Sequence, residues 1–251
     1  MDDTLKETMY FKFRDLIKDG PTLLKTPVEV KPLSPGEAIG YPGNEKYDYP
    51  LLRKKEVLLQ AKFGNSIGQA FTGVPTSFNG TLEDVLRLDM YAIRDMAIFT
   101  AVFNAVLRDR CLIKNTIHCR NNEPVECGQQ IAGNFFKEFG RVKVGIVGYQ
   151  PAFIEAFSNR FGSENIKATD LNPSNTGKIF SGVEILDGIK HGDEMISSSE
   201  LLLVSGSVFV NGTEEPFLEA ASKGKPVYYY GTTVTALAYL LDLPHVCPLS
   251  Q

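Results

Sequence analysis

The segment from residue 141 to residue 173 constrains the fold of this chain more than any other part of the sequence. An apolar run, Val142–Val147, leads into the turn Gly148–Pro151, and a second apolar run, Ile166–Thr169, ends at Asp170. Between the turn and the second run, apolar residues recur at helical spacing. This order predicts a strand, a tight turn, a helix and a second strand, which together make a βαβ unit of a parallel sheet.

The turn of this unit matches the dinucleotide-binding turn of Rossmann-type units only in part. Asp170 follows Gly148 at about the distance at which such units place an acid after the second strand. Gly145 and Gly148 are present, but Tyr149 and Gln150 stand where small residues let the backbone approach a pyrophosphate. We therefore expect a Rossmann-like scaffold that does not bind NAD in the standard pose.

Composition narrows the class of protein. The chain has 251 residues, of which 43% are hydrophobic, so it is long enough and apolar enough to bury a core. The net charge is −4 and the densest basic run is Arg53–Lys55, so nucleic acid is a poor partner. No apolar stretch reaches the roughly 18 residues that span a bilayer. Four cysteines and an N-terminus without a secretion pattern predict a cytoplasmic protein with reduced thiols and no membrane partner.

The two halves of the chain differ in their patterning. Short strands and helices alternate beyond Asp170 and predict about five parallel strands. Before this region we expect a helix over residues 4–19, a hairpin over residues 57–71 and a long buried helix, Met90–Asp109. The predicted fold is α/β: a small α+β domain over residues 1–112, followed by a Rossmann-like parallel-sheet domain over residues 113–251.

Glycines and hydroxyl residues follow three of the predicted parallel strands. Glycine lets a backbone approach a ligand, and helix N-termini offer unpaired N–H groups to it. The alternative is that the hydroxyls cap helices and the glycines turn the chain, and both readings can hold together. We expect these residues to line one crevice, because they follow strand ends on the same edge of the sheet: Gly148, Tyr149, Gln150, Ser205, Gly206, Ser207, Asn211, Gly212, Thr213, Gly231, Thr232 and Thr233.

Asp170 opens an oxygen-rich corner that continues with Asn172 and Asn175. In the functional interpretation Asp170 contacts a ribose or a cation, and it is the candidate metal ligand. In the alternative it is a turn residue ahead of Pro173.

The soft metal ligands are scattered along the chain. His118 and Cys119 are adjacent, Cys127 follows, and His245 and Cys247 lie near the end. No C-x-x-C pair occurs, and their spacing gives no reason to expect that they meet. Buried structural cysteines are the simpler interpretation, and a metal-storage site built from them is the alternative.

The phrases of the second half, taken together, resemble a known family. They are residues 148–152, 169–173, 205–207, 211–213 and 230–232. This combination is similar to the putative heavy-metal chelation family, whose largely uncharacterised members join an enolase N-terminal-like domain to a Rossmann-like domain. Residues 67–70 and Asn104 extend the resemblance into the first half. The resemblance implies a ligand site between the domains, heavy-metal chelation and a link to anaerobic cobalamin metabolism, but no enolase activity, because the catalytic barrel is absent.

The leading hypothesis is a cytoplasmic protein that binds a small polar ligand or metal complex between its domains. Gln69, Thr72 and Asn104 would supply the wall opposite the strand ends. The alternative is an enzyme that uses a nucleotide-type cofactor in a methyltransferase-like manner. The sequence leaves open whether a reaction is catalysed, which cofactor is used and whether the chain forms a homo-oligomer. Any metal is expected to be held by oxygen ligands around Asp170 or to arrive within a small-molecule complex.

Overall fold

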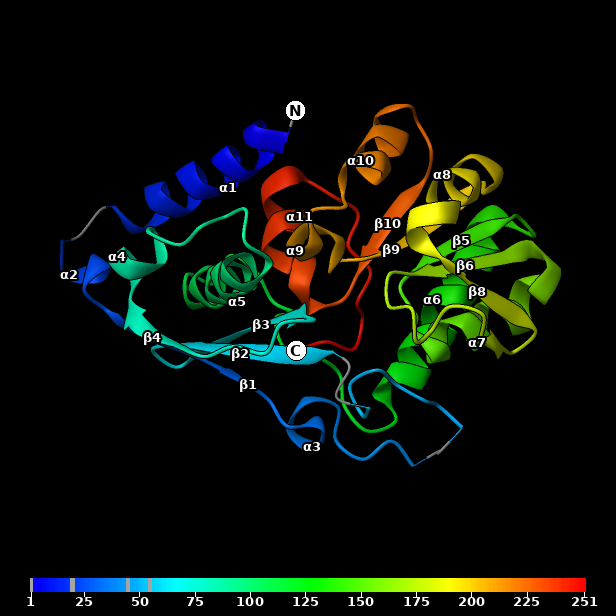
Figure 1. Cartoon of the computed structure of the whole chain (residues 1–251), viewed down its shortest axis with the longest axis horizontal. Helices are drawn as coiled ribbons and strands as arrows, with labels where there is room; N and C mark the ends of the chain where they lie inside the picture. Colours follow the sequence, from blue (N-terminus) through cyan, green and yellow to red (C-terminus); the bar gives the residue numbers. More distant parts are fainter. Residues whose placement is uncertain (1, 19–20, 44–45, 54–55) are drawn as a thin grey trace.

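The computed structural model describes residues 2–18, 21–43, 46–53 and 56–251. It is a mixed α/β structure with two sheets (Figure 1). The expected ends of the first helix at Gly20 and of the basic run at Lys54 and Lys55 lie outside the described residues. The division at residue 112 and the labels enolase N-terminal-like and Rossmann-like stay predictions.

The first sheet is antiparallel throughout and has the strand order β3-β2-β1-β4. The expected hairpin is present, because β2 and β3 pair along their whole length around the turn at Gly64. The strands are β1 (Pro27–Pro32), β2 (Val57–Phe63), β3 (Ser66–Thr72) and β4 (Phe78–Thr81).

The second sheet has the order β10-β9-β5-β6-β8-β7. Five of its strands are parallel, as expected, and β7 is added antiparallel at the edge. The strands are β5 (Val144–Val147), β6 (Ile166–Asp170), β7 (Ile179–Phe180), β8 (Val183–Asp187), β9 (Leu201–Ser205) and β10 (Val227–Tyr230).

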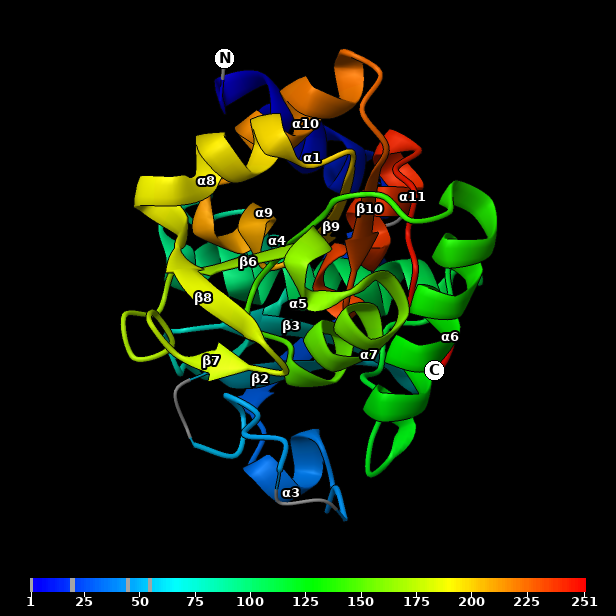
Figure 2. The ribbon, with the colours of Figure 1, turned by 90° about the vertical axis from the view of Figure 1, so that its right-hand side faces the viewer.

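Helices cover both faces of the parallel sheet, whereas the antiparallel sheet has its main helix packing on one face (Figure 2). The expected βαβ unit is β5, α7 and β6, and α7 begins at Pro151, whose missing N–H costs little at that position. The helices are α1 (Asp2–Ile17), α2 (Pro21–Leu24), α3 (Pro35–Ala38), α4 (Leu82–Val85), α5 (Ile93–Asp109), α6 (Glu123–Phe139), α7 (Pro151–Phe161), α8 (Gly188–Ser198), α9 (Val208–Asn211), α10 (Glu215–Ser222) and α11 (Thr235–Leu241), with the short 3-10 turns η1 (Ser163–Asn165) and η2 (Thr232–Val234).

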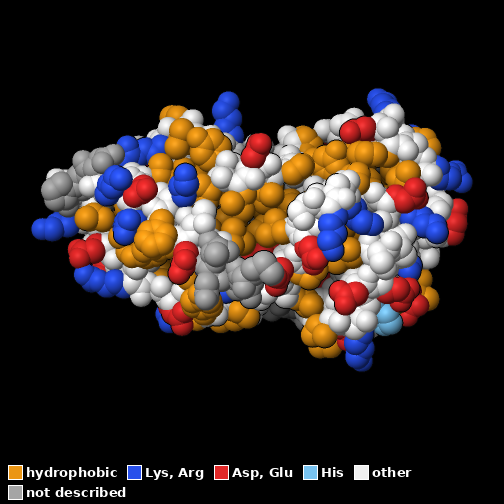
Figure 3. Space-filling view, turned by 90° about the horizontal axis from the view of Figure 1, so that it is seen from above, with side chains coloured by type: hydrophobic (Ala, Val, Ile, Leu, Met, Phe, Trp, Pro, Cys, Tyr) orange, Lys and Arg blue, Asp and Glu red, His pale blue; other side chains and the backbone are white. Residues whose placement is uncertain are grey.

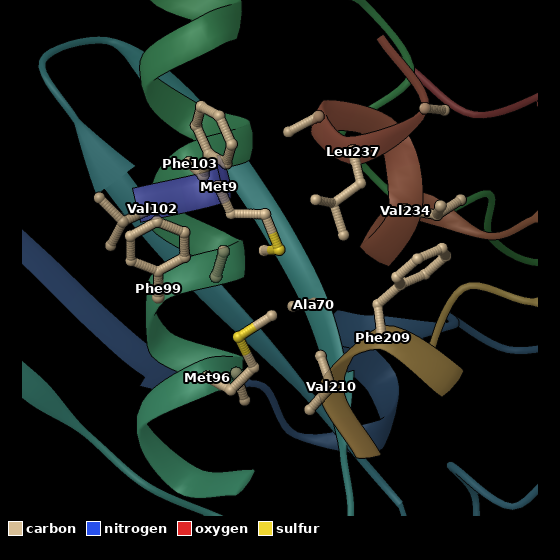
Figure 4. Packing of buried hydrophobic residues seen from close by; sticks show 14 of the residues in the cluster. Met9, Ala70, Met96, Phe99, Val102, Phe103, Phe209, Val210, Val234 and Leu237 are labelled. Atoms are coloured by element: carbon tan, nitrogen blue, oxygen red, sulfur yellow. The ribbon is translucent and has the colours of Figure 1, made fainter. Parts of the chain in front are cut away.

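The helix α5 is the centre of the first core. Every residue from Met96 to Leu107 is buried, because the helix packs on β2 and β3 with one side and meets α9 and α11 with the other. Figure 4 shows Phe99 and Phe103 of α5 in the same cluster as Phe209 and Leu237, which follow β9 and β10. The core beside the antiparallel sheet therefore continues into the parallel sheet.

The parallel sheet separates two cores. Along β9, Leu202 and Val204 belong to the core shared with α5, whereas Leu201 and Leu203 belong to a second core with α6 and α7. This alternation is expected for a strand that is covered on both faces. The sheet is thereby fixed between layers, and its carboxyl-terminal edge is left to line a cavity.

The described helices include none that is both long and apolar enough to cross a membrane.

Candidate ligand cavity

A cavity of about 730 Å³ lies at the carboxyl ends of β5, β6, β9 and β10. The end of β3, residues 49–51, Glu56 and residues 118–119 close its other side. Its volume falls within the range of about 300–1,000 Å³ that is usual for small-molecule sites. Figure 3 shows hydrophobic side chains gathered in the hollow between the two lobes of the molecule.

The strand register explains why residues from distant phrases meet here. Val147 pairs with Thr169 on one side and with Val204 on the other, and Tyr230 pairs with Ser205. The strands therefore end at one level. Most of the expected site residues line the cavity: Thr72, Gly148, Tyr149, Gln150, Asp170, Asn172, Ser205, Ser207, Asn211, Gly212, Thr213, Gly231 and Thr233.

Two glycines allow the chain to turn at this edge. Gly148 has a φ of 95° and Gly231 a φ of 91°, which other residues rarely adopt. A Cβ at Gly148 would also lie 2.9 Å from the hydroxyl of Tyr230, which donates a hydrogen bond to the main-chain oxygen of Val147. The turn after β5 is thus fixed against the end of β10.

Four of the expected site residues are not among those that line the cavity: Gln69, Asn104, Gly206 and Thr232. Asn104 is fully buried, and its Nδ2 donates to the main-chain oxygens of Gln69 and Thr232, both at 2.9 Å. Gln69 Oε1 accepts from the main-chain N–H of His118 at 2.7 Å. A Cβ at Gly206 would lie 2.6 Å from that of Val234. These residues hold the elements behind the wall together, so they position the cavity and do not face into it.

The carboxylate of Asp170 is already engaged by donors of this chain. Its Oδ2 accepts from the N–H of Tyr149 at 2.6 Å, and its Oδ1 accepts from the N–H of Asn172 at 2.7 Å and from Nδ2 of Asn175 at 3.1 Å. Asp170 therefore joins the turn after β5 to the loop after β6. These contacts agree with the interpretation of Asp170 as a turn residue. A contact of Asp170 with a ribose or a metal stays a prediction.

Glu56 is the carboxyl group that the sequence interpretation missed. It is partly buried and lines the cavity, and burial together with the negative charge of Asp170 raises its pKa to about 7. No sequence pattern identifies Glu56, because a single acid after the run Arg53–Lys55 is typical of a solvated charged segment.

Three side chains on the cavity wall carry a buried polar atom that has no hydrogen-bond partner among the described residues. These atoms are Tyr49 Oη, His118 Nδ1 and Gln150 Oε1. Tyr49 is 2% exposed and His118 is 7% exposed. Burial lowers the pKa of His118 to about 4, so its ring is neutral at neutral pH. Because an unpaired buried polar atom costs about 1–3 kcal/mol, such atoms indicate a missing partner.

Three cysteines gather on the same wall, contrary to the expectation from their spacing. Cys119, Cys127 and Cys247 are buried and line the cavity, and their thiols are free. The thiol of Cys127 lies next to both of the others, and that of Cys247 lies next to His245 as well. They meet because Ile117 and Gln251 exchange main-chain hydrogen bonds at 2.8 and 2.9 Å, which returns the end of the chain to this wall.

The three cysteines Cys119, Cys127 and Cys247, here called the thiol wall, do not form a metal site in this structure. Hydrogen bonding between the thiols and burial raise the pKa values of Cys127 and Cys247 to about 12. Over the described residues, no three His, Cys, Asp or Glu side chains are arranged to hold a metal ion. The expectation that any metal is held by oxygen ligands, or arrives within a complex, stays a prediction.

The carboxyl groups that line the cavity are not balanced by basic side chains. Four carboxyl residues line it, and none of its described residues is Lys or Arg. Asp193 and Glu215 are exposed, Asp170 is engaged as described, and Glu56 lies partly buried. The wall therefore disfavours an anionic ligand.

Comparison with known proteins supports the fold. A crystal structure of a protein of unknown function from Pyrococcus horikoshii is similar with a TM-score of 0.53 and 14% identity, over 95% of this chain and 82% of that chain. A crystal structure of a protein of unknown function from Desulfitobacterium hafniense DCB-2 is similar with a TM-score of 0.53 and 11% identity, over 94% and 84%. No curated protein matches the sequence.

Both of these structures come from the DUF364 family. The sequence itself matches the model of that family, described as "Putative heavy-metal chelation", over residues 132–245. This segment contains β5 to β10 and most of the strand ends that line the cavity. The resemblance noted from the sequence is therefore confirmed over residues 132–245, the part of the chain that matches the model of this family.

Proposed function

We propose that the protein binds a small polar ligand or a metal complex in the cavity between its two sheets. The observation that carries this proposal is the set of three unpartnered polar atoms in the lining of one cavity, Tyr49 Oη, His118 Nδ1 and Gln150 Oε1. A ligand that pairs with them would remove their desolvation penalty. The expected cytoplasmic setting and the link to cobalamin metabolism stay predictions.

The shape and lining of the cavity also support the proposal. Aromatic rings of Phe71, Phe153 and Tyr230 provide apolar surface, and the hydroxyls of Ser205 and Ser207 lie near the strand ends. Small-molecule sites usually combine such apolar surface with a few convergent polar groups. The family description of heavy-metal chelation agrees with a ligand that contains a metal.

The alternative, an enzyme with a nucleotide-type cofactor, has less support. A phosphate needs N–H groups or cations at the turn after β5. There the main-chain N–H of Tyr149 already donates to Asp170, and the next residue but one is Pro151, which has no N–H. The carboxyl groups of the wall would repel a phosphate as well.

Native mass spectrometry of the full chain, purified from its own host, tests the proposal together with metal analysis of the same sample. We expect a bound mass that is reduced in Tyr49→Phe and in Gln150→Leu, because each variant removes one polar group from the wall. Tyr41→Phe is the matched control, since Tyr41 is 86% exposed. A protein without any bound mass, or one whose bound mass is unchanged in both wall variants, would contradict the proposal.

A further inference from the structure

The charge balance of the cavity points to the chemical class of its ligand. Asp170 is satisfied by three N–H donors of the chain, and Asp193 and Glu215 are exposed to solvent. Glu56 differs from them, because it is partly buried and has no hydrogen bond or ion pair with the described residues. Removing a carboxylate from water without a partner is costly, so the ionised form of Glu56 needs a cation.

Two unpartnered polar atoms elsewhere in the cavity lining fit the same partner. Gln150 Oε1 is an acceptor without a donor, and His118 is a neutral ring whose Nδ1 is unpaired. A neutral imidazole does not repel a cation, and an amide oxygen accepts from one. A ligand with several N–H donors and a positive charge would satisfy these groups together.

The remaining wall indicates what carries the charged group. The rings of Phe153 and Tyr230 lie 4.9 Å apart between their centroids, and Phe71 packs edge-on against His118 at 5.2 Å. These rings supply apolar surface, and aromatic faces also attract cations. The site therefore suits a small apolar body that bears a cationic head.

We propose that the cavity selects an organic cation, a small apolar molecule with a protonated amine, amidine or guanidine group, which pairs with Glu56. This inference rests on the proposed function and specifies its ligand. A bare metal ion fits less well, because no three metal-ligating side chains of the described residues are arranged to hold one.

Three probes of nearly equal shape separate charge from shape: benzamidinium is cationic, benzamide is neutral and benzoate is anionic. Titration calorimetry of the full chain at pH 8, roughly one pH unit above the pKa of Glu56, gives their dissociation constants. We expect benzamidinium to bind at least about tenfold more tightly than benzamide, and benzoate most weakly. Glu56→Gln should bring the first two constants to within about twofold, with benzamide unchanged.

Glu29→Gln on the exposed face of β1 is the matched control and should keep the tenfold ratio. Circular dichroism verifies that the variants fold, and the ratio of benzamidinium to benzoate in the unchanged protein decides the inference even if Glu56→Gln does not. Benzoate binding as tightly as benzamidinium, or a ratio that survives Glu56→Gln, would overturn it. Tighter binding of hexaamminecobalt(III) than of benzamidinium would assign the charge to a metal complex and refute the organic cation. If no probe binds while native mass spectrometry finds a ligand, only this inference fails.

Discussion

Asn104 and Thr232 are 128 residues apart in the chain, yet the side chain of the first binds the main chain of the second. Asn104 Nδ2 donates to the oxygen of Thr232 and also to that of Gln69 in β3, while Asn104 Oδ1 accepts from the N–H of Ala236 at 2.8 Å. One buried amide on α5 thus links the antiparallel sheet to the segment that follows the last parallel strand. The two sides of the cavity are held in register by this link.

Replacing Asn104 with alanine should therefore destabilise the whole chain. The change removes the Asn104 partner from the main-chain oxygen of Gln69 and from the N–H of Ala236 in a fully buried place, while the oxygen of Thr232 keeps Thr235 as a donor. We expect a loss of about 3 kcal/mol in the free energy of unfolding. Urea denaturation followed by circular dichroism measures it. Asn134→Ala, at an exposed position of α6, should change stability by less than about 0.5 kcal/mol. Equal effects of the two changes would show that the link contributes nothing.

Gly68 allows β3 and α5 to approach more closely than any side chain would permit. A Cβ at this position would lie 2.3 Å from the main-chain oxygen of Ala101 and 2.3 Å from the nitrogen of Ala105. Because both atoms belong to the backbone of a buried helix, Gly68→Ala should cost more than about 3 kcal/mol. The control is Gly133→Ala in α6, where the nearest atom is the end of Arg160 at 3.7 Å and the change should stabilise by about 0.5–1 kcal/mol. Thermal unfolding of the two variants in opposite directions would confirm the close contact.

The periodicity of apolar residues predicted the helices and strands of this chain, but it predicted fewer of the tertiary contacts between them. The apolar girth of the helix before residue 110 predicted that it is buried, and α5 has twelve buried residues in succession, Met96–Leu107. The βαβ unit and the parallel strands followed from apolar runs, because a strand covered on both faces needs no polar alternation. Such signals are local, so a single sequence is enough to detect them.

The candidate site was predictable only where it follows strand ends. Polar residues on buried elements look the same in a sequence whether they bind a ligand or the backbone, and so Asn104 was assigned to the ligand although it bonds Thr232. Glu56 left no pattern at all. The meeting of Cys127 with Cys247 depends on the pairing of Gln251 with Ile117, which no local periodicity indicates.

Glu56 should make stability depend on pH in a direction opposite to that of most carboxyl groups. Its pKa is raised from 4.5 to about 7 by burial and by Asp170, so the folded state holds a proton that the unfolded state releases. Its contribution is fully present below pH 4.5 and is lost as the pH rises through 7. Glu56→Gln should remove this loss and gain up to about 2 kcal/mol at pH 8 relative to pH 4.5, since partial exposure screens part of the cost. Denaturation curves across this range measure the difference, and parallel profiles for both proteins would refute it.

His118 should act in the reverse direction. Burial lowers its pKa from 6.5 to about 4, so the unfolded chain binds a proton before the folded one does. The contribution of His118 to the free energy of unfolding is fully present above pH 6.5. It is lost as the pH falls toward 4, by at most about 3 kcal/mol. His118→Gln should flatten this acid limb, whereas His191→Gln should not, because the side chain of His191 is 42% exposed. NMR titration of the ring protons provides the direct check, and a His118 that titrates near pH 6.5 would contradict the prediction.

The four cysteines should differ sharply in their reactivity. Cys111 is exposed, whereas Cys119, Cys127 and Cys247 are buried. Alkylation needs the thiolate, and the pKa values of Cys127 and Cys247 are raised to about 12, so almost none is ionised at pH 8. Iodoacetamide at pH 8 should therefore add one group to the native chain and four groups in urea, as counted by mass spectrometry. Cys111→Ser should leave the native chain unmodified. Native labelling of Cys127 or Cys247 would show that the thiol wall is ionised, and a soft metal would then have ligands there that this structure keeps protonated.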